Sequence, residues 1–269
     1  MTIRLAVLGD PLAYTRSPDL HRAGASALGI AVESHAIRTS IAELPARLAS
    51  LAEQGFVGCN VTHPLKEAAR DAVSRASIAA ERARSVNTIV FQERGWFGET
   101  TDGPGFVDLM RELHREPERE RVVLLGAGGS ARSLAIALEW AGCRNVTVSS
   151  RRPEDSRFAW GEGLDSRFLG WRSDEESDAL SEASIVVNCT PLGENELPVP
   201  LERVNRGACL VDLVYGPEPT NWVRMARADG REAVDGLGLL VHQARRALSL
   251  WFGREVPFEP LAAAVGWPR

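Results

Sequence analysis

Residues 60–66 read Asn-Val-Thr-His-Pro-Leu-Lys and bring an amide, a hydroxyl, a proline and a lysine together directly after an apolar run. Asn60 and Thr62 alternate with the valine between them, so both are expected to face one side of a strand end. Pro64 fixes the backbone just before Lys66 and can begin a helix. A solvated loop would accept almost any polar residues here. The combination therefore favours a site that aims a cation at a substrate bearing hydroxyl groups.

A carboxylate able to pair with Lys66 would complete a unit for general acid–base catalysis. The stretch Thr-Thr-Asp-Gly-Pro-Gly at 100–105 offers Asp102 for this role. Asp-Gly is also common turn chemistry, so an ordinary turn is the alternative interpretation. Asp102 falls at the junction of two predicted domains, where ligand clefts tend to form.

A glycine-rich turn, Gly-Ala-Gly-Gly-Ser-Ala at 126–131, lies between an apolar strand pattern and a helical pattern. That context favours a dinucleotide site, because the first glycine permits a tight turn and the next lets the backbone approach a pyrophosphate. Ser130 is expected to cap the helix, whose N-terminal amides attract anions. A tight connection without a ligand is the alternative. The predicted cofactor residues of this turn are Gly126, Ala127, Gly128, Gly129 and Ser130.

The end of the next predicted strand indicates which dinucleotide binds. NAD sites usually carry an acidic residue about 20 residues past the glycines, which grips the ribose 2′-hydroxyl. Here the strand ends with Ser150, Arg151 and Arg152 and has no acid. Guanidinium groups can hold a 2′-phosphate with paired hydrogen bonds, so NADP is the predicted cofactor. A solvated basic turn is the alternative.

Short apolar runs, turns and segments of helical period alternate along the chain. This order predicts an α/β fold of parallel sheets with crossover helices. One α/β domain is predicted over 1–101 together with 236–269, and a second, Rossmann-like and NADP-binding, over 102–235, with a cleft between them. Elements are least defined between 153 and 183, where charge is high and periodicity is poor.

Capping residues and prolines mark the expected helix starts. Ser17 and Pro18 predict an N-cap and a first-turn proline. Ser40 and Glu43 predict a capping box before the next helix. From residue 236 onward an apolar stripe continues at helical spacing and predicts the last long helix.

Bulk composition excludes several classes of protein. The 269 residues are 44% hydrophobic and 25% charged, which is typical of a soluble globular chain. A net charge of −5 gives no field that would gather nucleic acid or an anionic membrane. The N-terminal residues form a strand pattern rather than a signal peptide, and no apolar run is long enough to span a bilayer. The cysteines are too dispersed for a metal site and are expected to be reduced in the cytoplasm; they are Cys59, Cys143, Cys189 and Cys209.

Nearly end to end, the chain resembles the shikimate dehydrogenase family. The resemblance rests on ordered blocks, each where a strand is predicted to end or a helix to begin. These blocks are GDPLAYTRSPDLH, NVTHPLK, SVNT, TTDGPGF, GAGGSAR, NCTPLG, DLVYGPEPT and DGLGLLVHQA. The resemblance implies that NADPH delivers hydride to the C3 carbonyl of 3-dehydroshikimate and so gives shikimate.

The same resemblance implies a role for each site residue. Lys66 is the expected catalytic acid and base, and Asp102 is expected to orient it. Thr15 and Ser17 are expected to bind the substrate carboxylate. The other expected substrate-binding residues are Asn60, Thr62, Asn87, Tyr215 and Gln243, and the expected residues beside the nicotinamide are Leu213 and Gly236. Gln243 also has the spacing of an inward-facing helical position, where a buried amide needs a polar partner in the ligand or in the protein.

Three positions depart from the pattern that this resemblance implies. Thr15 replaces the usual serine, with Tyr14 where a histidine is usual, and the added methyl could shift the preference among substrates. The usual Asn-Arg-Thr of an NADP site is replaced by Ser-Arg-Arg at 150–152, where the second arginine could compensate for the lost amide. Leu239 replaces a methionine, which is a packing exchange.

Several functions stay open at this point. One is a quinate/shikimate dehydrogenase that prefers NAD, although the two arginines argue against it. Another is a shikimate-binding protein without turnover, which would have no need to keep both Lys66 and Asp102. A third is a related NADP dehydrogenase, such as a folate enzyme, which would lack the paired N-terminal hydroxyls. A homodimer is compatible with the sequence but is not indicated by it.

Overall fold

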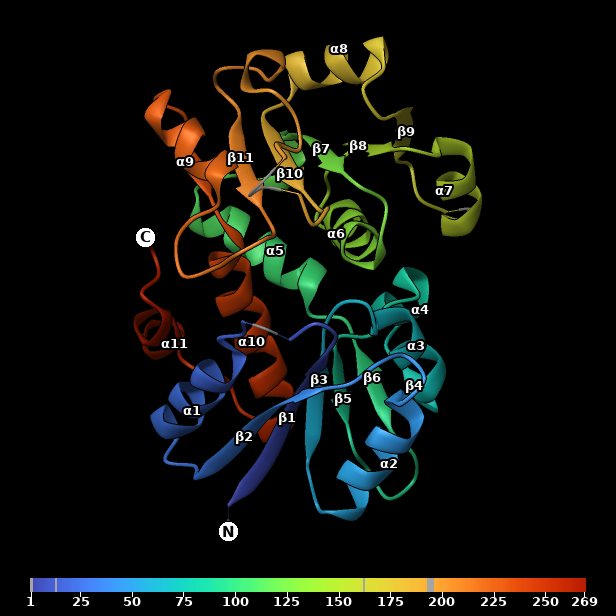
Figure 1. Ribbon diagram of the computed structural model, residues 1–269, viewed down its shortest axis with the longest axis vertical. Coiled ribbons are helices and arrows are strands. Elements are labelled where there is room, and N and C mark those ends of the chain that lie inside the picture. The colour runs from blue at the N-terminus through green and yellow to red at the C-terminus, as the bar shows by residue number, and fades with distance from the viewer. Residues whose placement is uncertain (1, 13, 162, 193–195) are drawn as a thin grey trace. The chain divides into compact units, whose positions relative to one another are not determined.

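The computed structural model describes residues 2–12, 14–161, 163–192 and 196–269 (Figure 1). The chain divides into two compact units. The first unit consists of Met1–Gly105 and Leu240–Arg269, and the second of Phe106–Leu239. The chain passes from one unit to the other within α5 (Asp102–Glu112) and again within α10 (Gly236–Phe252).

The first unit contains a six-stranded sheet in the order β2-β1-β3-β5-β6-β4. Its strands are β1 (Ile3–Gly9), β2 (Val32–Arg38), β3 (Gly58–Val61), β4 (Arg75–Ala76), β5 (Thr88–Val90) and β6 (Phe97–Glu99). β1 lies between β2 and β3 and pairs in parallel with both, as predicted. β5, however, pairs antiparallel with both β3 and β6, so the expectation of purely parallel pairing is wrong for this half of the sheet. The connection from β5 to β6, residues 91–96, is too short for a crossover helix, which is the physical reason why these two strands run antiparallel.

Helices cover both faces of this first sheet (Figure 1). They are α1 (Ser17–Ala27), α2 (Leu44–Glu53), α3 (Lys66–Ala72), α4 (Ile78–Ala83), α10, and α11 (Phe258–Val265). The apolar sides of α2, α3 and α4 form one buried cluster with β1 and β3. Trp251 of α10 donates its indole N–H to the carbonyl of Ile89 at 3.0 Å and so holds α10 against the sheet.

The predicted helix starts are displaced by one or more residues. Arg16, not Ser17, occupies the N-cap position of α1, and Pro18 lies in the first turn as expected. Glu43 accepts hydrogen bonds from both the backbone N–H and the hydroxyl of Ser40, but α2 begins only after Glu43. Half of the predicted capping box therefore forms, one turn ahead of the helix.

The second unit contains a six-stranded sheet in which every described pair is parallel. Its strands are β7 (Arg121–Leu125), β8 (Asn145–Ser150), β9 (Arg167–Gly170), β10 (Ile185–Asn188), β11 (Cys209–Asp212) and β12 (Ala233–Val234). From β9 to β12 their spatial order is 3-2-1-4-5-6, that of a doubly wound dinucleotide-binding sheet. The order reverses between β7 and β10, so the crevice of this fold opens where the glycine turn follows β7.

Four helices of the second unit follow its strands, and α5 leads into it. They are α6 (Gly129–Trp140), α7 (Pro153–Trp160), α8 (Asp174–Glu182) and α9 (Asn221–Ala228), with short 3₁₀ turns at η1 (Pro117–Arg119) and η2 (Leu201–Arg203). Residues of α8 and α9 form one buried cluster with β7, β10 and β11. The charged region 153–183 thus contains α7, β9 and α8. Ser173 caps α8 by accepting a hydrogen bond from the N–H of Glu176. Among the described residues, no helix is both long and apolar enough to cross a membrane.

Candidate active site

Lys66 and Asp102 form an ion pair in the first unit. Lys66 is the first residue of α3, and the N–H of Val86 donates to its carbonyl at 3.0 Å. Its Nζ donates to Oδ2 of Asp102 at 2.5 Å. The side chains are 17% and 6% exposed, so the pair is largely shielded while the ammonium stays within reach of a ligand. The acid–base pair expected from the sequence is therefore assembled.

The local helices make this pair electrostatically asymmetric. Asp102 lies in the first turn of α5, where the helix dipole favours a negative charge. Lys66 stands at the equivalent end of α3, where the dipole disfavours a positive charge. The neighbouring carboxylate offsets this cost, so removal of Asp102 would leave a poorly compensated ammonium.

Asn87 joins the ion pair to Gln243. Its amide nitrogen donates to Oδ1 of Asp102 at 2.8 Å and lies 2.9 Å from Oε1 of Gln243. The amide oxygen of Asn87 accepts from the backbone N–H of Thr101 at 2.8 Å, which fixes the orientation of the amide. Asn87 is only 2% exposed. Three of the expected site residues, one just before β5, one on α5 and one on α10, thus share one hydrogen-bond network.

Gly105 sets how closely α5 approaches α10. A Cβ on this residue would lie 2.9 Å from the backbone nitrogen of Gln243. Any side chain would push the helices apart and move the Gln243 amide away from Asn87. The glycine of the TTDGPG block is therefore required for packing at the site.

The expected carboxylate-binding hydroxyls lie where the loop after β1 meets α1: Thr15 is in the loop, and Ser17 is the first residue of the helix. Thr15 Oγ1 is 3.3 Å from both the hydroxyl and the backbone nitrogen of Ser17. β1 and β3 are parallel neighbours, so their carboxyl ends lie at the same edge of the sheet. The N–H of Thr62 donates to the carbonyl of Leu8 at 2.8 Å and ties the two strand ends together.

Asn60 is more internal than the sequence suggested. Its side-chain oxygen lies 2.9 Å from Nε2 of His21, and its nitrogen donates to the carbonyl of Asn87 and to Thr88 Oγ1 at 3.1 and 3.0 Å. Both ends of this amide are engaged by protein groups. Sequence reasoning gave no role to His21, although it ends the GDPLAYTRSPDLH block. Burial lowers the pKa of the His21 imidazole to about 4, so it is neutral at ordinary pH.

In the second unit, the glycine turn has the form that a pyrophosphate site needs. Gly126 has φ +105° and donates its N–H to the carbonyl of Ser149 at 2.8 Å. Gly128 occupies the N-cap position of α6, and a Cβ there would meet nothing within 4 Å. The turn and the N-terminal amides of α6 therefore fit an anionic dinucleotide. Ser130 lies in the first turn of the helix, so its predicted role as the cap is wrong.

The predicted 2′-phosphate residues lie at the end of β8, which is Ser150, and in the turn that follows it; β8 pairs with β7, the strand before the glycine turn. Ser150 Oγ lies 2.7 Å from Ser156 Oγ and accepts from the backbone N–H of Arg152 at 3.2 Å, so its hydroxyl helps to shape the turn into α7. Arg151 is exposed. The Arg152 side chain is 82% exposed and lies 3.7 Å from Asp155, a separation at which the ion pair is weak. Both guanidinium groups suit a solvent-accessible phosphate.

Leu213 and Gly236, the two residues expected near the nicotinamide, are adjacent in the structure. Gly236 donates its N–H to the carbonyl of Val214 at 3.1 Å, and a Cβ on it would collide with the carbonyl oxygen of Leu213. Only glycine fits this approach. Tyr215 follows in the same loop after β11 and is half-buried.

A buried carboxylate, Asp212, anchors the start of this loop. It accepts hydrogen bonds from Asn188 Nδ2 at 2.8 Å, Thr220 Oγ1 at 2.7 Å and the N–H of Val214 at 3.0 Å. Burial raises the pKa of Asp212 to about 6, with the nearby Asp235 adding to the shift. The network joins the ends of β10 and β11 to the start of α9.

The composition of the chain carries a further signal for the site, which the motifs do not contain. Lys66 is the only lysine among 269 residues, whereas the chain has 30 arginines. An arginine guanidinium does not release a proton in proteins, but a lysine ammonium can. Every other long basic side chain in the sequence is an arginine, and the single lysine stands at the position where the sequence predicts proton transfer.

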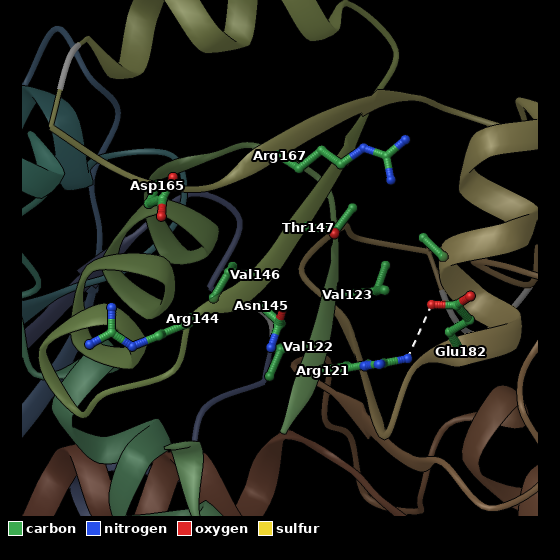
Figure 2. A pocket seen from close by; sticks show the side chains of 11 residues that line it. Arg121, Val122, Val123, Arg144, Asn145, Val146, Thr147, Asp165, Arg167 and Glu182 are labelled. Atoms are coloured by element: carbon green, nitrogen blue, oxygen red, sulfur yellow. Dashed lines mark hydrogen bonds and ion pairs between the residues drawn. The ribbon is translucent and has the colours of Figure 1, made fainter. Parts of the chain in front are cut away.

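A separate hollow of about 300 Å³ lies on the second unit and is lined by 11 residues (Figure 2). It lies at the amino ends of β7 and β8, the opposite ends from the glycine turn. Arg121 is paired with Glu182 at 3.1 Å, and the side chains of Arg144 and Arg167 extend in opposite directions in the view. Its cations do not converge on one point, so we do not assign this hollow to the active site.

A doubly wound dinucleotide-binding sheet and a separate Lys–Asp–Asn–Gln cluster define a nicotinamide-dependent dehydrogenase. Residues 7–89 match the family described as shikimate dehydrogenase substrate binding domain, and residues 236–265 match the shikimate 5′-dehydrogenase C-terminal domain. The chain belongs to the shikimate dehydrogenase family.

Individual relatives support this membership over nearly the whole chain. The chain is 40% identical to the shikimate dehydrogenase (NADP(+)) of Acidiphilium cryptum, covering 93% of this chain and 91% of the relative. It is 36% identical to the protein of the same name from Moorella thermoacetica, with 98% and 95% covered. The shikimate 5-dehydrogenase of Thermus thermophilus, solved in complex with NADP(H) and shikimate, superimposes with a TM-score of 0.87 at 34% identity and 98% coverage of both chains.

Proposed function

We propose that this chain catalyses the reversible, NADP-dependent reduction of 3-dehydroshikimate to shikimate. The observation that carries the proposal is the cluster in which Lys66 pairs with Asp102 at 2.5 Å while Asn87 holds the other carboxylate oxygen. The relatives named for this activity at 36–40% identity support it. The glycine turn, with the doubly wound strand order, supports the cofactor.

Lys66 donates the proton in the direction of reduction. NADPH, when bound, supplies the hydride that reaches C3 of the substrate. The ketone oxygen gains negative charge as this happens, and the Lys66 ammonium stabilises that charge more in the transition state than in the ground state. Lys66 transfers a proton to the oxygen and regains one from solvent. Asp102 orients the ammonium and accepts a hydrogen bond from a ring hydroxyl.

The remaining polar residues fix the substrate. Thr15 and Ser17 donate to the carboxylate, and Thr62, Asn87 and Gln243 bind the ring hydroxyls. Tyr215 contributes from the loop after β11. Because both ends of the Asn60 amide are engaged within the protein, its contribution is to support Asn87.

The two parts of the chain divide the work in this proposal. Residues 1–101 with 236–269 supply most of the substrate contacts, and residues 102–235 supply most of the NADP contacts. Asp102 and Gly236, at the two boundaries, each serve the other ligand. The turn from Gly126 to Ser130 holds the pyrophosphate, and Ser150, Arg151 and Arg152 surround the 2′-phosphate. Leu213 and Gly236 lie beside the nicotinamide. We also propose a cytoplasmic location, which the wide spacing of the cysteines along the sequence supports.

The direct test is oxidation of shikimate followed through the absorbance of the reduced nicotinamide, with NADP and NAD compared and quinate run in parallel. We expect the highest kcat/KM with shikimate and NADP. A higher value with quinate and NAD would replace the proposal by the NAD-preferring alternative. Tight shikimate binding in calorimetry with no turnover under any pairing would show a binding protein instead.

Hydrogen exchange with mass spectrometry tests the division of the ligands. We expect shikimate to protect peptides covering 60–66 and 87–102, and NADP to protect peptides covering 126–131 and 150–152. Shikimate protection confined to the second set would contradict the assignment even if the enzyme were active.

A further inference from the structure

A buried histidine lies at the far end of the hydrogen bonds that lead to Asp102. His21, on α1, is 0% exposed and meets the ring of Trp251 edge-on, with centroids 5.3 Å apart. Its Nδ1 lies 2.8 Å from Ser34 Oγ, and its Nε2 lies 2.9 Å from Asn60 Oδ1. Both ring nitrogens therefore have partners, and neither partner is the substrate or the ion pair.

The protonation of this ring follows from a backbone group. The carbonyl of Asn87 can only accept, so the nearby end of the Asn60 side chain, at 3.1 Å, must be its NH₂ group. Asn60 then presents its oxygen to His21, which requires a proton on Nε2. In the neutral ring Nδ1 is an acceptor, and Ser34 donates to it. The tautomer of His21 is thus fixed by the fold.

A second backbone group fixes the other end of this series of hydrogen bonds. The N–H of Thr101 can only donate, so the nearby atom of Asn87 is its amide oxygen. The NH₂ of Asn87 consequently faces Asp102 Oδ1. This is the orientation that an ionised carboxylate paired with Lys66 needs.

Thr88 connects the two amides. Its hydroxyl accepts from Asn60 Nδ2 at 3.0 Å and donates to Asn87 Oδ1 at 3.1 Å. Donors and acceptors therefore run in one direction from Ser34 through His21, Asn60, Thr88 and Asn87 to Asp102. If the oxygen and nitrogen of either amide were exchanged, a donor would face a donor or an acceptor would face an acceptor at the neighbouring residues.

We propose that His21 is a positioning residue: its Nε2–H orients the Asn60 amide and, through Thr88 and Asn87, holds the Asp102 carboxylate against Lys66. The inference rests on the proposed function in its kinetic consequence, but the positioning itself is a property of the protein alone. The low pKa of the buried imidazole agrees with this role, because the ring keeps a single N–H throughout the ordinary pH range.

The competing explanation is that His21 only fills space beside Trp251. A matched pair of substitutions separates the two. In His21→Gln, the amide nitrogen can take the place of Nε2 and still donate to Asn60. In His21→Asn, the shorter amide reaches only the position of Nδ1 and loses Asn60. We expect kcat of His21→Gln to stay within about twofold of wild type, and that of His21→Asn to fall about tenfold or more. The Kd for NADP should be unchanged in both.

A second pair of substitutions tests Thr88, which lies in the middle of the series of hydrogen bonds from His21 to Asp102. Thr88→Val removes the connecting hydroxyl with little change of shape, and Thr88→Ser keeps it. We expect kcat to fall about tenfold in Thr88→Val and to be largely retained in Thr88→Ser. This pair also covers the case in which His21→Asn does not fold.

The single lysine gives a readout that needs no substrate. Labelling with ¹³C at lysine Cε produces one side-chain signal, which reports the surroundings of Lys66. We expect this signal to move in His21→Asn and Thr88→Val and to keep its wild-type position in His21→Gln and Thr88→Ser. If wild type does not turn over shikimate, this experiment still decides the positioning.

Two results would overturn the inference. One is that folded His21→Asn and Thr88→Val, which lack a hydrogen bond of the series between His21 and Asn87, keep the wild-type kcat and the wild-type lysine signal. The other is that kcat falls as much in His21→Gln as in His21→Asn, and that in both variants the loss of kcat parallels a loss of thermal stability. That result is expected of a residue that only fills the core.

Discussion

His21 of the first unit and Asp212 of the second are buried titratable side chains that hydrogen-bond to the strands of their own sheets, and the two groups have opposite chemistry. In the first unit the group is His21, a base whose pKa burial lowers to about 4. In the second unit it is Asp212, an acid whose pKa burial raises to about 6. Burial is the largest cause in both cases and favours the neutral form of each. At neutral pH His21 is therefore uncharged, whereas Asp212, with a pKa of about 6, is still largely ionised.

The difference lies in what each network supports. The chain from His21 ends at an ion pair, Lys66 with Asp102, at the proposed site of proton transfer. The hydrogen bonds of Asp212 lead to the side-chain amide of Asn188 on β10 and to backbone and hydroxyl groups of the loop that carries Leu213. The first network supports a reacting charge, and the second supports only the shape of a loop.

The largest expected effect comes from Lys66. We expect Lys66→Ala to lower kcat by about 10³-fold or more, because it removes both the charge and the proton. Lys66→Arg keeps the charge but cannot release a proton, so it should lose nearly as much. The Kd for NADP, measured by fluorescence titration, should stay unchanged in both. Substantial turnover by Lys66→Arg would show that charge alone is enough and would remove the proton-donor role.

The next effect is acid sensitivity conferred by His21. The unfolded imidazole takes up its proton near pH 6.5 and the folded one near 4, so the unfolded state binds more protons between these values. The free energy of unfolding of wild type should therefore fall as pH is lowered through this range, by roughly 3 kcal/mol. His21→Gln should lack this component in urea denaturation at neutral and acidic pH. Equal pH dependence of the two proteins would contradict it.

Asp212 should give the free energy of unfolding a pH dependence of the opposite sign. Its folded pKa of about 6 lies above the ordinary 3.8, so the folded state binds more protons between these values. The free energy of unfolding should fall as pH rises through the range, again by roughly 3 kcal/mol. Asp212→Asn removes this component and should gain stability relative to wild type on going from acid to neutral pH. If His21→Gln and Asp212→Asn change the pH dependence of the free energy of unfolding in the same direction, the contrast between the units is wrong.

The smallest expected effect concerns the cofactor. Arg151→Ala should lower the ratio of kcat/KM for NADP over NAD by about tenfold, because a charge-assisted hydrogen bond to the 2′-phosphate is lost. Arg152→Ala should act in the same direction. The KM for shikimate at saturating cofactor serves as the internal control and should not change. An unaltered ratio in the double variant would place the 2′-phosphate elsewhere.

Local sequence signals predicted most elements but not all of their pairing. The glycine turn, the strand before it and the helix after it are regular enough to be recognised from residues 121–142 alone. The antiparallel placement of β5 could not be foreseen, because it depends on pairing with β3, which lies about 30 residues earlier in the chain. Caps were also misplaced: Arg16 and Gly128 occupy positions that were assigned to neighbouring serines.

The candidate site shows the same limit. Lys66 and Asp102 could be named from their blocks, and the structure places them 2.5 Å apart. The engagement of Asn60 with His21 could not be predicted, since it depends on how α1 packs over β3. Residue types suggested which side chains could bind a ligand. Only packing shows which of them are already bound within the protein.

Lys66 also has a practical consequence at the bench. Amine-directed reagents, such as succinimidyl esters and aldehyde fixatives, find one side-chain amine in this protein, and it is the one paired with Asp102. Labelling or immobilisation through lysine would therefore act as inhibition, and shikimate should protect against it. Fluorophores and surface tethers are better attached through engineered thiols.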